Sequence, residues 1–340
     1  IALLDSLNCV DYLCFGCETD SIDLLNTVAE ILINEPKEYK DLLTINLKTG
    51  ISFPKARAKA LDEYFKKYNL DYSLDINSNK YAKYPSDITS NSNLDINTFI
   101  NQPNNILGIE YIKALMRFNS KINPVPLKRL GAGYHSLDTR TKLASATGIR
   151  TAMANKDNIS GLLPDNCLNI IKNHTTIEYN DFSTVLGSKL LSMDTLDHIE
   201  GINQDLSNRI ANNKYNFTDI ETFIPMLQSK NYTYSAISRA LLHIILDIKT
   251  DDIKEFISNN YVNYAMILGF NKNTGILSEI NKYTKIPLVS KFATFYKEAD
   301  NNQRKMLDIN LKADNLYRMI YMNKTSETLP TEFQRQIIIK

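Results

Sequence analysis

The stretch DYLCFGCETDSIDLLNTVAEIL (11–32) decides the fold class of this chain. Its first part, DYLCFG (11–16), is a short apolar run that ends in Gly, which predicts a buried strand followed by a tight turn. The second part, SIDLLNTVAEIL (21–32), has apolar residues at helical spacing behind Asp20 or Ser21 as the capping residue. A strand that leads into an amphipathic helix indicates an α/β unit.

The same alternation continues along the first half of the chain. Helices are predicted at FPKARAKALDEYFKKY (53–68) and QPNNILGIEYIKALMRF (102–118), each with a proline suited to its first turn. Residues 71–99 are rich in Asn, Ser and Asp, which predicts a surface loop or an insertion. PVPLKRLG (124–131) predicts a strand that runs into a glycine loop. Strands that alternate with helices indicate a parallel, wound sheet.

After about residue 155 the pattern becomes helical. Four helical segments follow in series with short connections: DFSTVLGSKLLSM, IEGINQDLSNRIANN, DIETFIPMLQSK and TYSAISRALLHIILDI. Near the end, YAMILGFN, TGILSEINKY and IPLVSKF predict a small strand–helix–strand unit, and NNQRKMLDINLKADNLYRMIYM predicts a last helix. We therefore expect two domains, an α/β domain at 1–154 and a mainly helical domain at 155–340.

Composition limits the class of protein. The chain has 340 residues, with 39 basic and 38 acidic side chains, so a large, uniformly basic nucleic-acid surface is not expected, and neither is a DNA partner. No apolar run reaches the length of about 18 residues that a membrane span needs. Four cysteines do not make a disulfide framework, which favours the cytoplasm. The first residues, IALLDSLNCV, contain no secretory signal, and because they begin inside a helical pattern without Met we expect an upstream portion.

One local charge imbalance stands out between residues 121 and 150. It holds six basic side chains and a single acid, Asp138; the six are Lys121, Lys128, Arg129, Arg140, Lys142 and Arg150. Such a cluster is commonly a solvated loop. Here it overlaps the run ASATGIR (144–150), a mixture of hydroxyls, small residues and an arginine that neither a core helix nor a surface helix favours.

The chemistry of this run suits a phosphate chain. If Ser145 caps the helix, the next backbone N–H groups lie at the positive end of the helix dipole and form an anion site. Thr147 adds a second hydroxyl, Gly148 lets a ligand approach the backbone, and Arg150 adds a forked cation. A plain capped helix with Thr and Arg facing water remains the alternative, because a cap needs only one hydroxyl.

SATGIR is similar to the Ser-x-Thr-x-Ile-Arg signature of the HIGH-superfamily nucleotidyltransferases. More closely, the chain resembles the bacterial tRNA(Met) cytidine acetate ligase family over nearly its whole length. The segments that carry the resemblance are LCFGCE (13–18), PNNILGIEYIKAL (103–115), LKRLGAGYHS (127–136), LASATGIR (143–150), NYTYSAISRALLHIIL (231–246) and IPLVSK (286–291). The resemblance implies a partial Rossmann-like nucleotide-binding domain followed by the helical domain.

The resemblance also implies an activity. Such ligases activate acetate with ATP to give acetyl-adenylate and pyrophosphate, then transfer the acetyl group to the N4 amine of the wobble cytidine of elongator tRNA(Met). It implies that ATP is contacted by Gly16, Asn104 and Arg129 as well as by Ser145, Thr147 and Arg150. Gly16 and Arg129 each end a predicted strand, where open α/β sheets bind ligands. Mg²⁺ is expected to accompany ATP, bound chiefly through the phosphates.

The chain departs from the family at one motif. The family's His-x-Gly-His lies upstream, and none of His135, His174, His198 and His243 is part of such a pattern. Paired histidines of this kind stabilise charge on the transferred phosphate. We therefore assign no catalytic residue and expect that these 340 residues alone do not catalyse adenylation, which acetate-dependent pyrophosphate exchange tests.

A second group of residues suits RNA. Lys230, Tyr232, Tyr234 and Arg239 interleave cations with aromatic rings, a mixture that stacks on unpaired bases and grips phosphates. The alternative is a helix packed on its neighbour, with an arginine whose stem lies along the surface. His243, on the apolar side of the same helix, is expected to be a core or groove residue.

Other interpretations stay open. Cys14 and Cys17 form a C-x-x-C pair, but no second pair follows at metal-ligand spacing, so buried small side chains are expected rather than a metal site. As alternatives to the ligase, the chain could be a non-catalytic nucleotide- or RNA-binding remnant, or a small-molecule adenylyltransferase. The long helical domain disfavours the latter, because a small metabolite needs no such docking surface.

Overall fold

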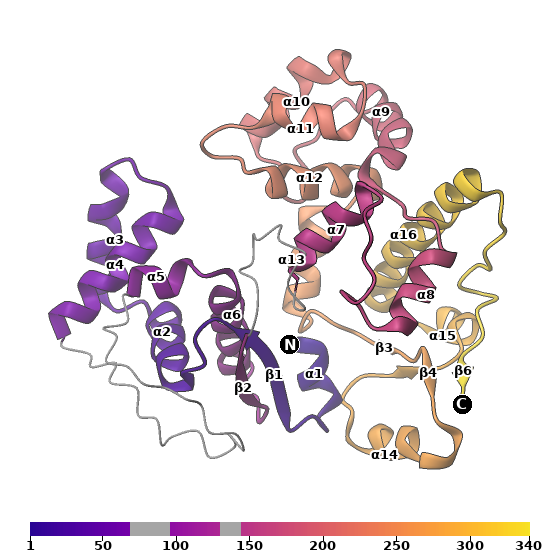
Figure 1. Cartoon of the computed structure of the whole chain (residues 1–340), viewed down its shortest axis with the longest axis horizontal. Helices are drawn as coiled ribbons and strands as arrows, with labels where there is room; N and C mark the ends of the chain where they lie inside the picture. The colour runs from indigo at the N-terminus through magenta and orange to yellow at the C-terminus, as the bar shows by residue number, and fades with distance from the viewer. Residues whose placement is uncertain (69–95, 130–143) are drawn as a thin grey trace. The chain divides into compact units, whose positions relative to one another are not determined.

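The fold is described from a computed structural model, which describes residues 1–68, 96–129 and 144–340. By its contacts the chain divides into two compact units (Figure 1). Unit 1 consists of Ile1 and Val10–Asn169, and unit 2 of Ala2–Cys9 and Ile170–Lys340. The functional division at residues 154 and 155 stays a prediction, and each unit is described by itself.

In its described residues, unit 1 contains one pair of strands and several helices. Along the chain its elements are β1 (Tyr12–Cys17), α2 (Ile22–Asn34), α3 (Lys37–Lys48), α4 (Phe53–Tyr68), α5 (Ile96–Asn101), α6 (Pro103–Arg117), β2 (Asn123–Lys128) and α7 (Ala146–Ala154). The helix α8 (Asp165–Asn173) follows at the division between the units. This order confirms the α/β class expected from the sequence.

The two strands of unit 1 are parallel. In their register Gly16 lies opposite Leu127 and Cys17 opposite Lys128, and the pairing continues where the Arg129 N–H donates to the Cys17 carbonyl at 2.8 Å. Exposed and buried side chains alternate along the second half of β1, with Phe15 and Cys17 buried. Because successive side chains of a strand point to opposite faces, one face of β1 is covered and the other, which includes Gly16, is exposed.

Helices α2 and α6 pack against each other and against this strand pair. The side chain of Ser21 accepts a hydrogen bond from the Leu24 N–H, which confirms the cap expected for α2. In α6 the glycine of PNNILG has a packing role, since a Cβ at Gly108 would lie 2.6 Å from the ring of Phe15. The Phe15 ring in turn meets Tyr111 edge to face, with ring centroids 5.7 Å apart. Strand β1 and helix α6 therefore approach more closely than a side chain at position 108 allows.

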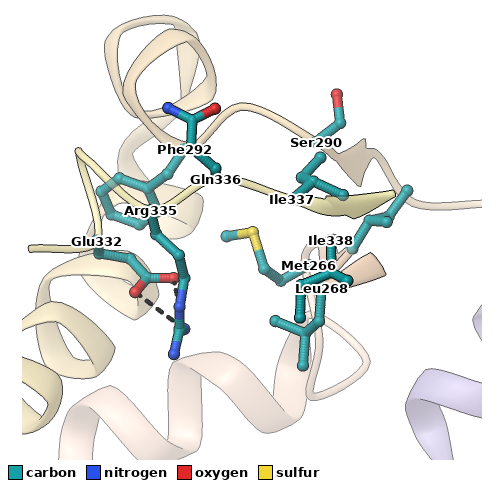
Figure 2. A pocket seen from close by; sticks show the side chains of 10 residues that line it. Met266, Leu268, Ser290, Phe292, Glu332, Arg335, Gln336, Ile337 and Ile338 are labelled. Atoms are coloured by element: carbon teal, nitrogen blue, oxygen red, sulfur yellow. Dashed lines mark hydrogen bonds and ion pairs between the residues drawn. The ribbon is translucent and has the colours of Figure 1, made fainter. Parts of the chain in front are cut away.

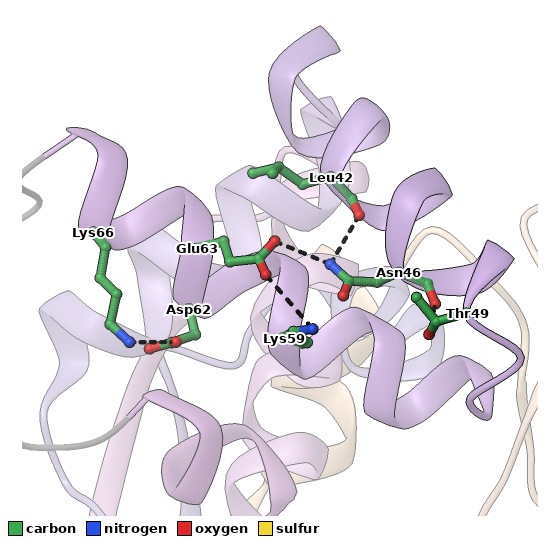
Figure 3. Close-up of polar contacts among 7 residues, drawn as sticks. All are labelled: Leu42, Asn46, Thr49, Lys59, Asp62, Glu63 and Lys66. Atoms are coloured by element: carbon green, nitrogen blue, oxygen red, sulfur yellow. Dashed lines mark hydrogen bonds and ion pairs between the residues drawn. The ribbon is translucent and has the colours of Figure 1, made fainter.

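A polar contact fastens α3 to α4 (Figure 3). The buried side chain of Asn46 donates to the Leu42 carbonyl within α3 and to Glu63 of α4, both at 3.0 Å. Glu63 also faces Lys59 at 3.9 Å. The sequence analysis identified α4 but not α3, whose polar residues dominate its composition.

The prediction of a surface loop at 71–99 is wrong at its end. Residues 96–101 form α5, in which Ile96, Phe99 and Ile100 are buried in the core of unit 1. The burial of three apolar side chains outweighs the weak helix propensity of the surrounding Asn and Thr. The remainder of that prediction, up to residue 95, lies outside the described residues.

Unit 2 is mainly helical. It begins with α1 (Ala2–Leu7) and continues with α9 (Ser183–Ser192), α10 (Gln204–Asn213), α11 (Ile220–Leu227), α12 (Tyr234–Leu246), α13 (Thr250–Ser258), α14 (Ile276–Tyr283), α15 (Phe292–Glu298) and α16 (Asn301–Thr325), together with the short strands β3 (Ala265–Met266), β4 (Gly269–Phe270), β5 (Leu288–Val289) and β6 (Ile338–Ile339). The four helices expected in series are α9 to α12, so this prediction is confirmed.

Local side-chain caps start three of these four helices, α10, α11 and α12. Asn203, Asp219 and Thr233 each accept a hydrogen bond from the backbone of the following first turn, and so begin α10, α11 and α12. The apolar faces of α9 to α12 enclose one core that includes Leu186, Phe223 and Ile244. Burial of their apolar faces in this shared core holds the four helices against one another.

The predicted strand–helix–strand unit is also present. β3 and β5 pair in parallel, with α14 between them in the chain, and β4 pairs in parallel with β6. A parallel pair needs a crossover connection, which α14 provides. Among the described residues, no helix is both long and apolar enough to cross a membrane.

Candidate nucleotide site

Helix α7 begins at the hydroxyl-rich run as the sequence predicts. The Ser145 hydroxyl accepts a hydrogen bond from the Gly148 N–H at 2.9 Å, and the Ser145 side chain is buried. This confirms Ser145 as the cap. The N–H groups of Ala146 and Thr147 precede the first intrahelical bond, and with the helix dipole they form a positive end to the helix.

Two further side chains lie on the first turns of α7. Thr147 is half-buried and Arg150 is exposed, and an Arg150 Nη lies 3.5 Å from the Thr147 hydroxyl. At that length the contact is weak, so the guanidinium keeps donors available for a ligand. Ser145, Thr147 and Arg150 thus share one helix start, which we call the α7 group.

Gly16, Asn104 and Arg129 form a second group, the β1–β2 group. An Arg129 Nη donates to the Asn104 Oδ1 at 3.1 Å, and a Cβ added to Gly16 would lie 3.2 Å from the Arg129 Cγ. The arginine side chain therefore lies along the backbone of Gly16, where no Cβ is present, while the Asn104 side chain accepts a hydrogen bond from its guanidinium. Arg129 itself is exposed, so its remaining donors face outward at the carboxyl ends of two parallel strands.

The residue that supports this group was missed by the sequence analysis. The Glu18 carboxylate accepts from the Asn104 side chain at 2.7 Å and from the Asn105 N–H at 3.0 Å. Glu18 stands one residue after β1, where functional side chains of parallel sheets gather, and this position was the signal that could have identified it. The two asparagines of PNNILG therefore lie at the start of α6 and also link this helix to Glu18.

The structure brings together each group of predicted ATP ligands. Arg129 contacts Asn104 and lies beside Gly16, and Ser145, Thr147 and Arg150 share a helix start. The contacts described above lie within each group. Two other members of the basic cluster, Arg140 and Lys142, lie outside the described residues, as does the neighbouring His135.

The predicted RNA residues surround the start of α12. Lys230, Tyr234 and Arg239 are exposed, whereas Tyr232 is half-buried and its hydroxyl donates to the Asn203 side chain at 2.6 Å. The Arg209 guanidinium lies 5.9 Å from the centre of the Tyr232 ring. Partial desolvation raises the pKa of Tyr234 above its ordinary value. Tyr232 therefore links the start of α12 to α10. Unit 2 also contains another aromatic–cation pair, formed by Lys214 and the highly exposed Tyr215.

The expectation for the C-x-x-C pair is half right. Cys17 is buried, and burial raises the pKa of its thiol to about 12, but Cys14 is exposed. Two residues three positions apart in a strand point to opposite faces, so the pair does not converge on one ion. Among residues 1–68, 96–129 and 144–340, no three His, Cys, Asp or Glu side chains gather as a metal site needs.

His243 fits the expected core or groove role. Its side chain is half-buried, and its Nδ1 lies 2.8 Å from the carbonyl oxygen of Glu200. This contact joins α12 to the loop before α10 and leaves the ring with a structural function.

Two hollows are lined by residues outside these groups. A pocket of about 190 Å³ in unit 2 is lined mainly by apolar side chains such as Met266 and Phe292, and its Glu332 and Arg335 pair with each other at 3.1 Å (Figure 2). A groove of about 530 Å³ along α4 and α5 contains Lys59 and Lys66, which face Glu63 and Asp62. In both, the opposite charges meet one another, which weakens either hollow as a triphosphate site.

Comparisons with known proteins identify the family of the chain. Residues 1–332 match the HIGH Nucleotidyl Transferase family. The tRNA(Met) cytidine acetate ligase of Halothermothrix orenii is 31% identical over 336 residues, which cover 94% of this chain and 75% of that protein. The enzyme of the same name from Clostridium acetobutylicum is 32% identical over 346 residues, covering 100% of this chain and 79% of that protein.

A solved structure shares the fold. The crystal structure of Thermotoga maritima TmcAL in its apo form superposes with a TM-score of 0.81 at 24% identity, covering 99% of this chain and 78% of that one. A second crystal form of that protein, bound with alpha-thio ATP, gives the same TM-score. From the family match and the relatives above 30% identity, the chain belongs to the HIGH nucleotidyltransferases and, among them, to the tRNA(Met) cytidine acetate ligase family.

Proposed function

We propose that the chain takes part in ATP-dependent tRNA modification, in which acetate is activated as acetyl-adenylate and the acetyl group passes to the N4 amine of the wobble cytidine of elongator tRNA(Met). The names of the relatives support the tRNA, the cytidine and the acetate. The alpha-thio ATP bound to Thermotoga maritima TmcAL supports the nucleotide. The cytoplasm, where tRNA is modified, is the proposed location.

The single observation that carries the nucleotide half is the placement of Arg129. Its side chain runs along Gly16, its guanidinium is held by Asn104, and its remaining donors are exposed. An arginine fixed in this way loses little side-chain entropy when it binds phosphate and contributes charge-assisted hydrogen bonds. The α7 group supplies a second set of donors of the kind that helix starts offer to phosphates.

The proposed reaction has two steps. An acetate oxygen attacks the α-phosphorus of ATP, and the bond to the leaving pyrophosphate breaks. The cytidine N4 then attacks the acetyl carbon, AMP leaves, and the amine loses a proton. In both steps the role proposed for Arg129, Ser145, Thr147 and Arg150 is to hold phosphate oxygens and so stabilise their charge. Mg²⁺ is proposed to accompany ATP through its phosphates.

The tRNA half rests on unit 2. Lys230, Tyr234 and Arg239 are proposed to contact RNA through phosphates and exposed bases, with Tyr232 helping to hold the start of α12.

Titration of the chain with ATP by isothermal calorimetry tests the nucleotide half. Arg129→Ala is expected to weaken ATP binding by about tenfold, because one charge-assisted contact is lost. The matched control is Arg117→Ala, an exposed arginine in the last turn of α6, about 20 Å along the helix from Asn104. The control is expected to bind ATP as the unchanged chain does. Equal affinity of both variants, or no ATP binding by the unchanged chain, contradicts the proposal.

A further inference from the structure

Glu18 joins the end of β1 to the start of α6 through three hydrogen bonds. Its carboxylate accepts from the Asn104 side chain at 2.7 Å, from the Asn105 N–H at 3.0 Å and from the Asn104 N–H at 3.4 Å. The charge thus lies at the positive end of a helix of 15 residues, where the helix dipole favours a carboxylate. These backbone donors of α6 are consequently not offered to a phosphate.

Hydrogen bonds also run in the reverse direction, from the backbone after β1 to a side chain of α6. The Asn105 Oδ1 accepts from the N–H groups of Glu18 and Thr19, both at 3.0 Å. Asn105 is fully buried, and its amide nitrogen donates to the Phe99 carbonyl at 3.1 Å and to Gln102 at 2.7 Å. The backbone that carries Glu18 therefore has a fixed position, and so does its carboxylate.

This fixed carboxylate determines how the Asn104 amide is turned. An amide has a donating nitrogen end and an accepting oxygen end, a carboxylate only accepts, and a guanidinium only donates. Because Glu18 lies on one side of Asn104 and Arg129 on the other, only one orientation satisfies both contacts. In that orientation the oxygen faces Arg129 and holds its guanidinium beside Gly16.

We propose that Glu18 is a positioning residue for ATP, which acts on the nucleotide by fixing the Asn104 amide and, through it, Arg129. The inference rests on the proposed function, in which Arg129 binds the phosphates. The inference predicts a change in ATP affinity opposite to the one expected from charge alone. Removing a negative charge near a polyanion ordinarily strengthens binding. Here the neutral variant is expected to bind ATP less well, because its amide keeps one accepting end and puts a donor against either the Asn105 N–H or the Asn104 donors.

A double-mutant cycle with ATP titrations tests the chain of contacts. Glu18→Gln is expected to weaken ATP binding about fivefold in the unchanged chain and to have no further effect in the Arg129→Ala chain, because coupled residues are not additive. The matched control is Asp20→Asn, which removes the same charge two residues away and is expected to keep or slightly raise the affinity. Thermal unfolding of each variant identifies the fraction that is folded.

Three outcomes overturn the inference. Stronger ATP binding by Glu18→Gln means that the charge acts only at a distance, and unchanged binding means that it does not act on ATP. An equal loss in both backgrounds means that Glu18 serves the fold alone. If Glu18→Gln does not fold, Glu18→Asp, whose shorter side chain withdraws the carboxylate from Asn104, replaces it in the same cycle, and an additive loss again overturns the inference. Absence of ATP binding by the unchanged chain refutes the proposed function instead.

Discussion

At the scale of single residues, the sequence indicated candidate site residues but not the contacts that hold them in place. Gly16 and Arg129 were predicted from their places after strands and from the family resemblance. Their direct contact, with the Arg129 stem lying where a Cβ of residue 16 would be, depends on the parallel register of two strands that are more than 100 residues apart in the chain. Glu18 was missed because its place one residue after a strand is its sole sequence signal, and its contact with α6 depends on the fold.

The two cysteines of β1 give a prediction at this scale. Cys14 is exposed and Cys17 is buried, with the pKa of the Cys17 thiol raised to about 12 by burial. Since the thiolate is the reactive form, iodoacetamide at pH 8.5 is expected to modify Cys14 well before Cys17 in the folded chain. Peptide mass spectrometry over time measures both rates. In urea the two rates are expected to become similar, and similar rates without urea would show that Cys17 is not protected.

At the scale of elements, local signals were reliable and buried short elements were not. The caps Ser21 and Ser145 were predicted because a cap depends on neighbouring residues alone. Helix α5 was missed because its six residues follow an Asn-rich stretch, and its stability comes from the burial of Ile96, Phe99 and Ile100 against distant parts of unit 1. Tertiary packing of this kind overrides local propensity.

Gly108 tests the close approach of α6 and β1. Alanine inside a helix is ordinarily more stable than glycine, by about 1 kcal/mol. A Cβ at this position lies 2.6 Å from the Phe15 ring, which is itself packed against Tyr111. Gly108→Ala is therefore expected to lower the free energy of unfolding by about 1–3 kcal/mol, measured by urea denaturation. Leu107→Ala, on the exposed side of α6, serves as control and is expected to change it by less than about 1 kcal/mol. A stabilised Gly108→Ala chain would disprove the close contact.

At the scale of the whole molecule, the change from alternating strands and helices to helices alone was visible in the sequence. The contacts place residues 155–169 with unit 1 and Ala2–Cys9 with unit 2. In unit 2 the backbone of Lys285 donates to the Ser6 carbonyl at 2.8 Å, and Lys285 also pairs with Asp5 at 3.3 Å. No periodicity reveals such a pairing, because it joins segments about 280 residues apart in the chain.

Substitution of Arg239 tests whether this residue of unit 2 binds tRNA without affecting ATP binding. Arg239→Ala is expected to weaken tRNA binding and to reduce the slope of log affinity against log salt concentration by about one, since one phosphate contact is lost. ATP affinity is expected to stay unchanged. Filter binding at several salt concentrations measures the slope, and Arg335→Ala, an exposed arginine of unit 2 paired with Glu332, is the control. An unaltered slope for Arg239→Ala removes this residue from the RNA surface.

The most direct test of the account is a crystal structure of the chain with a nonhydrolysable ATP analogue. We predict that the phosphates contact Arg129 beside Gly16 and the capped start of α7 at Ser145, with the Asn104 and Glu18 contacts unchanged. An analogue bound elsewhere, with Arg129 and the α7 start free of phosphate, would contradict the assignment of the nucleotide site.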